Sequence, residues 1–154
     1  KKEYKKDFKI TQKKIFKNHQ KMIAKKCIPL RHITCDVIDI KNKTKALPAS
    51  EIVLTKTKTF DYKAKYTKGA VKEITPANIE ESLMKKIQNL ALKSHKALGC
   101  KSISRTDIIL NKTNNKLYVL ETNTLPGMTK TSFIPEQAKV IGIDMKGLIS
   151  ILLG

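Results

Sequence analysis

Two short apolar runs separated by four polar residues constrain the fold of this chain more than any other feature. Residues 103–111 (ISRTDIILN) and 116–122 (KLYVLET) are rich in β-branched and other apolar residues, and each has the length of a strand. Residues 112–115 (KTNN) join them, and asparagine tolerates the left-handed backbone that a tight turn requires. The sequence therefore predicts a β-hairpin here.

The hairpin carries charged side chains at alternate positions. Because side chains alternate faces along a strand, Arg105 and Asp107 share one face, and Glu121 and Asn123 share one face of the next strand. A loop of residues 113–115 would place Asp107 opposite Glu121 and Arg105 opposite Asn123. Two carboxylates about 5 Å apart repel unless a cation lies between them. Mg²⁺ accepts one or two carboxylates together with phosphate and water, and a guanidinium suits phosphate.

A Pro-Gly turn follows this hairpin at once. Pro126-Gly127 allows a backbone N–H to point freely at a ligand, and Ser132 adds a hydroxyl group. Such donors can hold a developing oxyanion. The sequence thus favours a metal and phosphate site, while the alternative is a surface hairpin whose charges face water.

Two more strands and a loop are predicted before the hairpin. Residues 33–40 and 46–57 have strand composition, and the polar turn-like run 41–45 between them predicts a second antiparallel hairpin. Residues 59–69 (TFDYKAKYTKG) show no clean period and predict an ordered loop of the kind that carries functional tyrosine and lysine.

Three helices are predicted around these strands. The clearest covers residues 76–98, with Thr75 as its N-cap and Gly99 as its C-terminal stop. Its apolar stripe consists of Ile79, Leu83, Ile87, Leu90, Ser94 and Ala97. Pro135 with Glu136 predicts a short helix, and Asp144 is expected to cap a last one that ends at Leu153. The order of elements predicts an α+β fold, with an antiparallel sheet and packed helices.

The net charge of +19 limits the range of partners. The chain has 154 residues, enough for one domain or part of a larger protein. A strongly basic surface attracts nucleic acid, but arginine and aromatic residues are scarce and Trp is absent. We therefore favour a lysine-rich solvated surface over a nucleic-acid-binding module. Residues 1–26 hold eleven lysines and two acids, and weak helical spacing there suggests an exposed amphipathic helix or a segment separated from a partner on which it once packed.

Cysteine use and hydropathy bear on the compartment. Three cysteines without CxxC spacing indicate buried thiols in a reducing compartment. No apolar run approaches the roughly 20 residues that span a bilayer. The first residue is Lys1, so a fragment or a processed form is expected.

Four motifs in order along the chain resemble a known family. The segments FDYKAKYTKG, ITPANI, ALGCKSISRTDIIL and YVLETNTLPGMTKTSFIP are similar to D-alanine–D-alanine ligases, which are ATP-grasp enzymes. The resemblance is strong over residues 46–153 and weaker over 15–33. It implies an ATP-grasp C-terminal catalytic lobe over residues 33–154, preceded by a degraded basic helical segment and hinge remnant over residues 1–32.

The resemblance implies ATP-dependent ligation of two D-alanines to D-alanyl-D-alanine for peptidoglycan synthesis in the bacterial cytoplasm. The first D-alanine is phosphorylated on its carboxylate, and the second attacks through a tetrahedral intermediate. The implied cofactor is Mg²⁺ or Mn²⁺, with ATP as co-substrate. The implied metal ligands are Asp107, Glu121 and Asn123. Arg105 and Gly127 would stabilise the intermediate, Ser132 would bind the acceptor carboxylate, Lys65 would neutralise phosphate, and Tyr62 and Tyr66 would close the site.

The nucleotide hinge departs from the family pattern. The aligned run is residues 24–32, in which Lys25 and His32 occupy acidic positions and Leu30 a glycine position. Neutral histidine offers one acceptor where a ribose diol is held by a carboxylate. The implied nucleotide-binding residues are Lys26, Ile28, His32 and Lys65.

The family's first domain and its glycine-rich phosphate loop have no counterpart in this sequence. A separate chain carrying that lobe, or a homodimer, is one way to complete the site. The isolated chain is expected not to turn over, and the alternative function is an inactive remnant of a split ligase gene.

Overall fold

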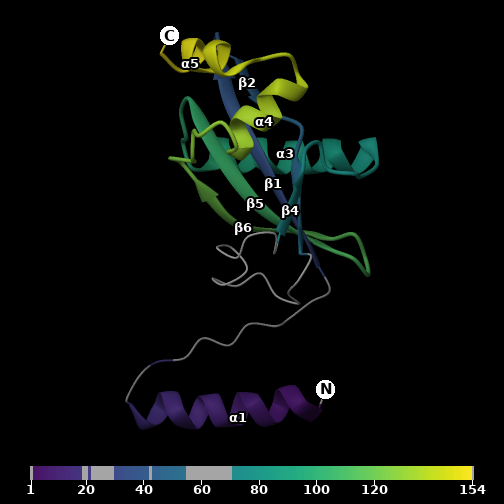
Figure 1. Ribbon diagram of the computed structural model, residues 1–154, viewed down its shortest axis with the longest axis vertical. Coiled ribbons are helices and arrows are strands. Elements are labelled where there is room, and N and C mark those ends of the chain that lie inside the picture. Colours follow the sequence, from purple (N-terminus) through teal and green to yellow (C-terminus); the bar gives the residue numbers. More distant parts are fainter. Residues whose placement is uncertain (1, 19–20, 22–29, 42, 55–70, 154) are drawn as a thin grey trace.

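The computed structural model describes residues 2–18, 21, 30–41, 43–54 and 71–153. An antiparallel sheet is its main element, with helices packed on both faces (Figure 1). The predicted α+β class is therefore confirmed. None of the described helices is long and apolar enough to cross a membrane. The elements are α1 (Lys2–Lys17), β1 (Leu30–Ile40), β2 (Lys43–Ala46), β3 (Ser50–Leu54), β4 (Val71–Ile74), α3 (Glu81–Ala97), β5 (Ile103–Asn111), β6 (Leu117–Asn123), α4 (Phe133–Val140) and α5 (Met145–Leu153).

Strand β1 is the centre of the sheet. The strand order is β4-β3-β1-β5-β6, and β2 pairs with the second half of β1. Because side chains alternate along β1, Ile33, Cys35 and Val37 face α3 in one buried cluster, and Ile38 packs with α4 and α5 in another. The sheet is thus covered by α3 on one face and, at one end only, by α4 and α5 on the other.

The predicted strand 46–57 is divided between the end of β2 and β3 in its described part, and its residues 55–57 lie outside the described residues. Residues 43–45 of the predicted turn 41–45 belong to β2. Lys41 takes a positive φ of 44° at the turn, and β2 begins at Lys43. The Leu47 N–H still bonds the Asp36 carbonyl of β1, and the chain then leaves the ladder, because Pro48 has no N–H to donate. Pairing with β1 resumes at Ser50.

Gln137 of α4 closes the gap that this break leaves beside β1. Its Oε1 accepts from the Asp36 backbone N–H at 3.0 Å, and its Nε2 donates to the Thr34 carbonyl at 3.2 Å and the Ser50 hydroxyl at 3.0 Å. The Gln137 side chain is completely buried. One side-chain amide therefore replaces a missing stretch of strand and fixes α4 on the sheet.

Helix α3 begins later than the sequence predicts. The N-cap is Glu80, whereas Thr75 hydrogen-bonds through its hydroxyl to the Ser50 hydroxyl at 2.6 Å, and the Thr75-Pro76 peptide is cis. Residues 75–80 thus lie against the sheet and are not a first helical turn. Gly99 ends the helix as predicted, with a φ of +63°. Its N–H bonds the Lys96 carbonyl, and the Cys100 N–H bonds the His95 carbonyl, which is a Schellman motif.

The buried stripe of α3 also differs from the prediction at its C-terminal end. Ile87, Ala91 and His95 are its buried residues, and Ala97 is exposed. His95 is buried because its Nδ1 bonds the Ser104 hydroxyl at 2.8 Å. Its Nε2 is buried without a hydrogen-bond partner in the described structure, so a histidine bonded at one nitrogen takes a core position that sequence patterns assign to apolar residues.

The remaining helices agree with the sequence. Helix α4 begins two residues before Pro135, and Asp144 caps α5 by accepting from the Gly147 N–H at 2.7 Å. Helix α1 is the predicted amphipathic helix, and its Phe8, Ile10 and Phe16 side chains are exposed.

Candidate functional site

The β5–β6 hairpin brings the predicted charged residues together through a β-bulge. Asp107 pairs with Glu121, and Arg105 pairs with Asn123, as predicted. The connection over residues 112–115 is a four-residue turn, in which the Asn111 N–H donates to the Lys116 carbonyl and the Asn111 carbonyl accepts from the Asn115 N–H, both at 2.9 Å. The three-residue loop assumed for the pairing is therefore wrong. From that turn Ile108 pairs with Val119, so one extra residue, Leu120, lies in β6 before the Asp107 pair.

The bulge decides which face Glu121 occupies. In a regular ladder without a bulge, the register from the turn would pair Leu120 with Asp107 and Glu121 with Thr106, which is buried on the α3 face. A shift of one residue moves a side chain to the other face of a sheet. Leu120 therefore places the two carboxylates on one face, opposite each other.

Asp107 is the best anchored of these side chains. Its Oδ1 accepts from the Thr34 hydroxyl at 2.8 Å and from Arg105 Nε at 3.1 Å, and Arg105 Nη2 reaches Oδ2 at 3.4 Å. Arg105 and Asp107 are about a quarter exposed. Both therefore remain open to a ligand.

Glu121 and Asn123 complete the oxygen donors. The Glu121 carboxylate is exposed, and within the described ranges no side chain pairs with it. Asn123 Oδ1 accepts from the Leu125 N–H at 2.9 Å and keeps a second lone pair. No three His, Cys, Asp or Glu side chains of the described residues gather as a metal site. Two carboxylates and an amide fit a hard cation that takes its other ligands from phosphate and water.

The Pro-Gly turn and Ser132 also meet. A Cβ at Gly127 would lie 3.0 Å from Ser132 Oγ, so the glycine backbone abuts that hydroxyl. Ser132 Oγ accepts from the Thr129 N–H at 3.0 Å and contacts the Thr129 hydroxyl at 2.9 Å. Gly127 and Ser132, which the sequence groups together, are therefore neighbours in space.

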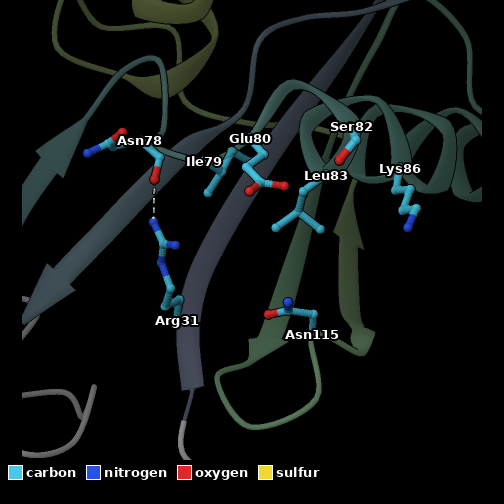
Figure 2. Close-up of a pocket in the computed structure, with 8 residues that line it drawn as sticks. All are labelled: Arg31, Asn78, Ile79, Glu80, Ser82, Leu83, Lys86 and Asn115. Atoms are coloured by element: carbon cyan, nitrogen blue, oxygen red, sulfur yellow. Dashed lines mark hydrogen bonds between the residues drawn. The ribbon is translucent and has the colours of Figure 1, made fainter.

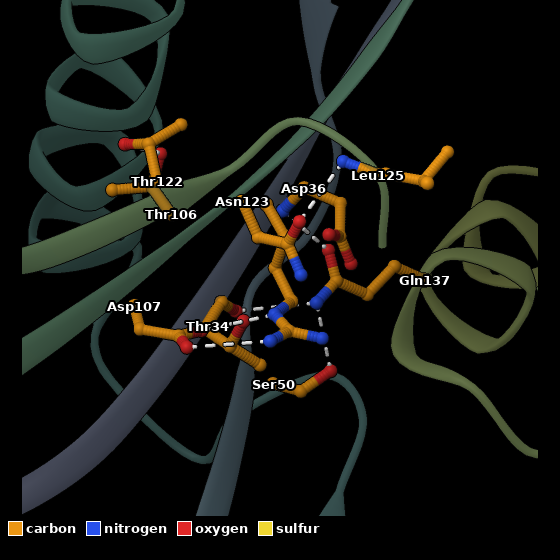
Figure 3. Close-up of polar contacts among 10 residues, drawn as sticks. Thr34, Asp36, Ser50, Thr106, Asp107, Thr122, Asn123, Leu125 and Gln137 are labelled. Atoms are coloured by element: carbon orange, nitrogen blue, oxygen red, sulfur yellow. Dashed lines mark hydrogen bonds and ion pairs between the residues drawn. The ribbon is translucent and has the colours of Figure 1, made fainter. Parts of the chain in front are cut away.

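Asp36 is a residue at this site that sequence reasoning missed. Its side chain is completely buried, and neither carboxylate oxygen has a hydrogen-bond partner in the described structure. Figure 3 shows it beside Asn123 and Gln137. Burial raises its pKa well above the usual range, the nearby Arg105 charge opposes that rise, and Asp107 adds to it. An acid between Cys35 and Val37 in an apolar strand was the available signal.

Asp36 lies directly across the sheet from Arg105. Its N–H bonds Gln137 and its carbonyl accepts from the Leu47 N–H at 2.8 Å, so both backbone groups point away from β5. The pair is therefore of the non-hydrogen-bonded type, in which Cα atoms are about 4.5 Å apart and side chains are closest.

The nucleotide-side predictions are mostly beyond the described structure. Lys26, Ile28, Tyr62, Lys65 and Tyr66 lie outside the described residues. His32 is on β1, two residues before Thr34 and on the same face of the sheet. Burial lowers its pKa, and the Asp107 charge partly offsets that effect.

A surface pocket lies elsewhere, on the α3 side (Figure 2). Arg31 lies there and donates to the Asn78 carbonyl at 2.9 Å and to Glu51 Oε1 at 2.6 Å. Arg31 shares its face with Ile33, whereas Asp107 faces the other way. The pocket is thus separate from the predicted site. Its lining is Arg31, Asn78, Ile79, Glu80, Ser82, Leu83, Lys86 and Asn115.

A buried Ser-His-Asp group on the α3 face does not form a second site. His95 bonds Ser104, and its Nε2 lies 3.8 Å from Asp39 Oδ2. Ser104 is completely buried and His95 is 2% exposed. A substrate could not reach this serine, so the group serves packing.

Comparison with known proteins gives consistent matches. The sequence model of the family described as D-ala D-ala ligase C-terminus matches residues 2–154. The chain is 45% identical over 143 residues to the D-alanine–D-alanine ligase of Leptospira interrogans serovar copenhageni, covering 90% of this chain and 40% of that protein. It is 44% identical to the D-alanine–D-alanine ligase of Desulfotalea psychrophila, covering 80% of this chain and 38% of that protein.

Solved structures give the same picture. The VanG D-Ala:D-Ser ligase from Enterococcus faecalis superimposes with a TM-score of 0.71 at 32% identity, covering 84% of this chain and 37% of that one. The D-alanine–D-alanine ligase from Bacillus anthracis complexed with ATP gives a TM-score of 0.64 at 32% identity, covering 83% and 40%. The chain spans about 40% of the length of these relatives.

Proposed function

This chain belongs to the D-alanine–D-alanine ligase family, and on that premise we propose that it supplies the metal- and phosphate-binding half of a ligase that joins two D-alanines. ATP is the co-substrate, a divalent cation such as Mg²⁺ or Mn²⁺ is the cofactor, and the product serves peptidoglycan synthesis in the bacterial cytoplasm. The rest of the site belongs to a segment that the chain's relatives have and this sequence does not include.

The reaction has two steps. The carboxylate of the first D-alanine attacks the γ-phosphorus of ATP, which gives an acyl phosphate and ADP. The amine of the second D-alanine then attacks the acyl carbon, and the tetrahedral intermediate expels inorganic phosphate and loses a proton. In phosphoryl transfer a protein mainly positions groups and neutralises charge.

The described side chains suit these steps. Asp107, Glu121 and Asn123 would hold the cation, which when bound would neutralise phosphate charge. Arg105 and the Gly127 N–H would stabilise the oxyanion of the intermediate. Ser132, adjacent to Gly127, would bind the acceptor carboxylate. For Lys65, Tyr62 and Tyr66 the roles of phosphate neutralisation and site closure rest on the family resemblance.

The observation that carries these roles is the bulged register of β5 and β6. It sets Asp107 opposite Glu121 and Arg105 opposite Asn123 on one face. A surface hairpin with unrelated charges would not need an extra residue to bring both carboxylates together.

Activity of a completed enzyme tests this function. We would co-express the chain with the N-terminal part of the Leptospira interrogans ligase and measure ADP and D-alanyl-D-alanine formed from ATP, Mg²⁺ and D-alanine. Asp107→Asn should lower the rate by about 100-fold or more, because a preorganised charge is lost. The control Glu81→Gln changes an exposed acid that pairs with Lys85 and should leave the rate unchanged. Equal rates for Asp107→Asn and the control would contradict these roles.

An inactive remnant of a split gene is the second candidate, and His32 favours it. Its lowered pKa keeps the imidazole neutral, so it cannot replace a carboxylate at the ribose. ATP binding to the completed protein, measured by calorimetry, separates the two. Affinity similar to that of the intact relative would exclude decay, and no binding together with no turnover would establish it.

A further inference from the structure

The Asp36 carboxyl group is buried without a partner beside the charged site. Both oxygens lack hydrogen bonds within the described structure, and the side chain is completely excluded from solvent. A buried carboxyl group without a hydrogen-bond partner lowers the stability of the folded state, so its presence requires an explanation. Its cross-strand neighbour Arg105 carries the positive charge that acts on it.

Arg105 currently pairs with a different carboxylate. Its Nε and Nη2 contact the two carboxylate oxygens of Asp107. The Thr34 hydroxyl also donates a hydrogen bond to Oδ1. A divalent cation on Asp107 would repel the guanidinium and use the same lone pairs. Binding of a cation would therefore weaken the Arg105–Asp107 contacts.

We propose that Asp36 is a positioning residue for Arg105, and that it holds the guanidinium when a divalent cation takes the Asp107 carboxylate. The inference about the cation rests on the proposed function of the site. Arg105 would thus have two ion-pair partners, Asp107 without the cation and Asp36 with it. The pair with Asp36 would fix the planar guanidinium while its ligand-facing side stays open.

The geometry favours Asp36 over the other acids nearby. Asp36 and Arg105 form a non-hydrogen-bonded pair, in which side chains are closest. Glu121 would be engaged by the same cation. The Arg105 charge also acts on Glu73, but β4 and β5 are not neighbouring strands, so Glu73 is not a cross-strand partner of Arg105. Gln137 fixes the backbone of Asp36 by its bond to the N–H, so the carboxyl group is held in place and ready.

A test without metal uses Asp107→Ala, which removes the carboxylate that Arg105 contacts. Asp36→Asn alone should raise or leave unchanged the urea midpoint, because it removes an unpaired acid. In the Asp107→Ala background, Asp36→Asn should lower the midpoint, because Arg105 then pairs with Asp36. The control Asp39→Asn, whose carboxylate accepts from the Ser102 N–H on the other face, should give the same shift in both backgrounds. Equal shifts for Asp36→Asn in both backgrounds would overturn the proposal.

A spectroscopic test reads Arg105 directly. The chain has only two arginines, Arg31 and Arg105, so ¹⁵N NMR of arginine Nε–H groups gives two assignable signals. With Mg²⁺, the Arg105 signal should shift and stay protected from exchange in the wild type, and lose protection in Asp36→Asn. Arg31, paired with Glu51, is the internal control. If the Arg105 signal loses protection with Mg²⁺ in the wild type as well as in Asp36→Asn, the pairing with Asp36 is wrong but the metal site stands. If Mg²⁺ changes the Arg105 signal in neither protein, the metal site and this inference are both wrong.

Discussion

At the scale of single residues, the Asp36 carboxyl group links stability to pH. Burial raises its folded-state pKa, so the native protein holds a proton that the unfolded chain loses near pH 4. Stability therefore falls as pH rises from that value through the folded pKa. Asp36→Asn should gain more stability at pH 7 than at pH 4.5 in urea unfolding without metal. A gain that is larger at the lower pH would contradict this sign.

Gln137 is the residue with the largest expected structural effect. Gln137→Leu keeps the volume but leaves the Asp36 N–H, the Thr34 carbonyl and the Ser50 hydroxyl without their partner. A loss of about 3 kcal/mol or more in unfolding free energy is expected, since each unsatisfied buried group costs about 1–3 kcal/mol. Urea titration measures it.

Gln88 supplies the matched control for this substitution. It lies half-buried on α3 and donates one bond, to the Leu47 carbonyl at 3.2 Å. Gln88→Leu should cost about 1 kcal/mol. Equal losses for the two glutamines would show that Gln137 does not replace a strand.

At the scale of elements, the bulge in β6 determines the site. Deleting Leu120 would remove the bulge, and the ladder would then run directly from the Ile108–Val119 pair to an Asp107–Glu121 pair. The deletion variant should therefore still be stabilised by Mg²⁺, because both carboxylates stay on one face. The substitution Leu120→Ala keeps the residue count at a position that is 58% exposed, so it should change stability by about 0.5 kcal/mol or less. A deletion variant that Mg²⁺ no longer stabilises would contradict this account of the register.

The types of the helices and strands could be predicted from local sequence patterns, but some of their boundaries could not. Alternation placed Arg105 and Asp107 on one face, and Asp144 and Gly99 marked helix ends correctly. The start of α3 was missed because Thr75 is held by Ser50, which is distant in sequence.

The predicted site pairing was correct for an incomplete reason. The assumed loop was one residue too short, and the bulge at Leu120 offset the difference. Gln137 and Asp36 could not be found from local pattern, because their importance depends on α4 packing against β1. Tertiary contacts thus decide the details that chemistry needs.

At the scale of the whole molecule, the charge of +19 opposes compactness. Raising salt from about 0.01 M to about 0.15 M shortens the screening length from about 30 Å to about 8 Å. The urea midpoint should therefore rise with salt. A variant with exposed Lys93 and Lys96 changed to glutamine should show a smaller rise, and a midpoint that falls with salt would contradict self-repulsion.

Strand β6 ends the described sheet and carries exposed Tyr118, Val119 and Leu120. A free apolar edge is a template for another strand, and it promotes aggregation. The bulge bends this edge and interrupts its ladder. A second molecule could therefore align with only one side of the interruption, so the bulge that sets the carboxylate pair also shortens the edge on which misassembly could start.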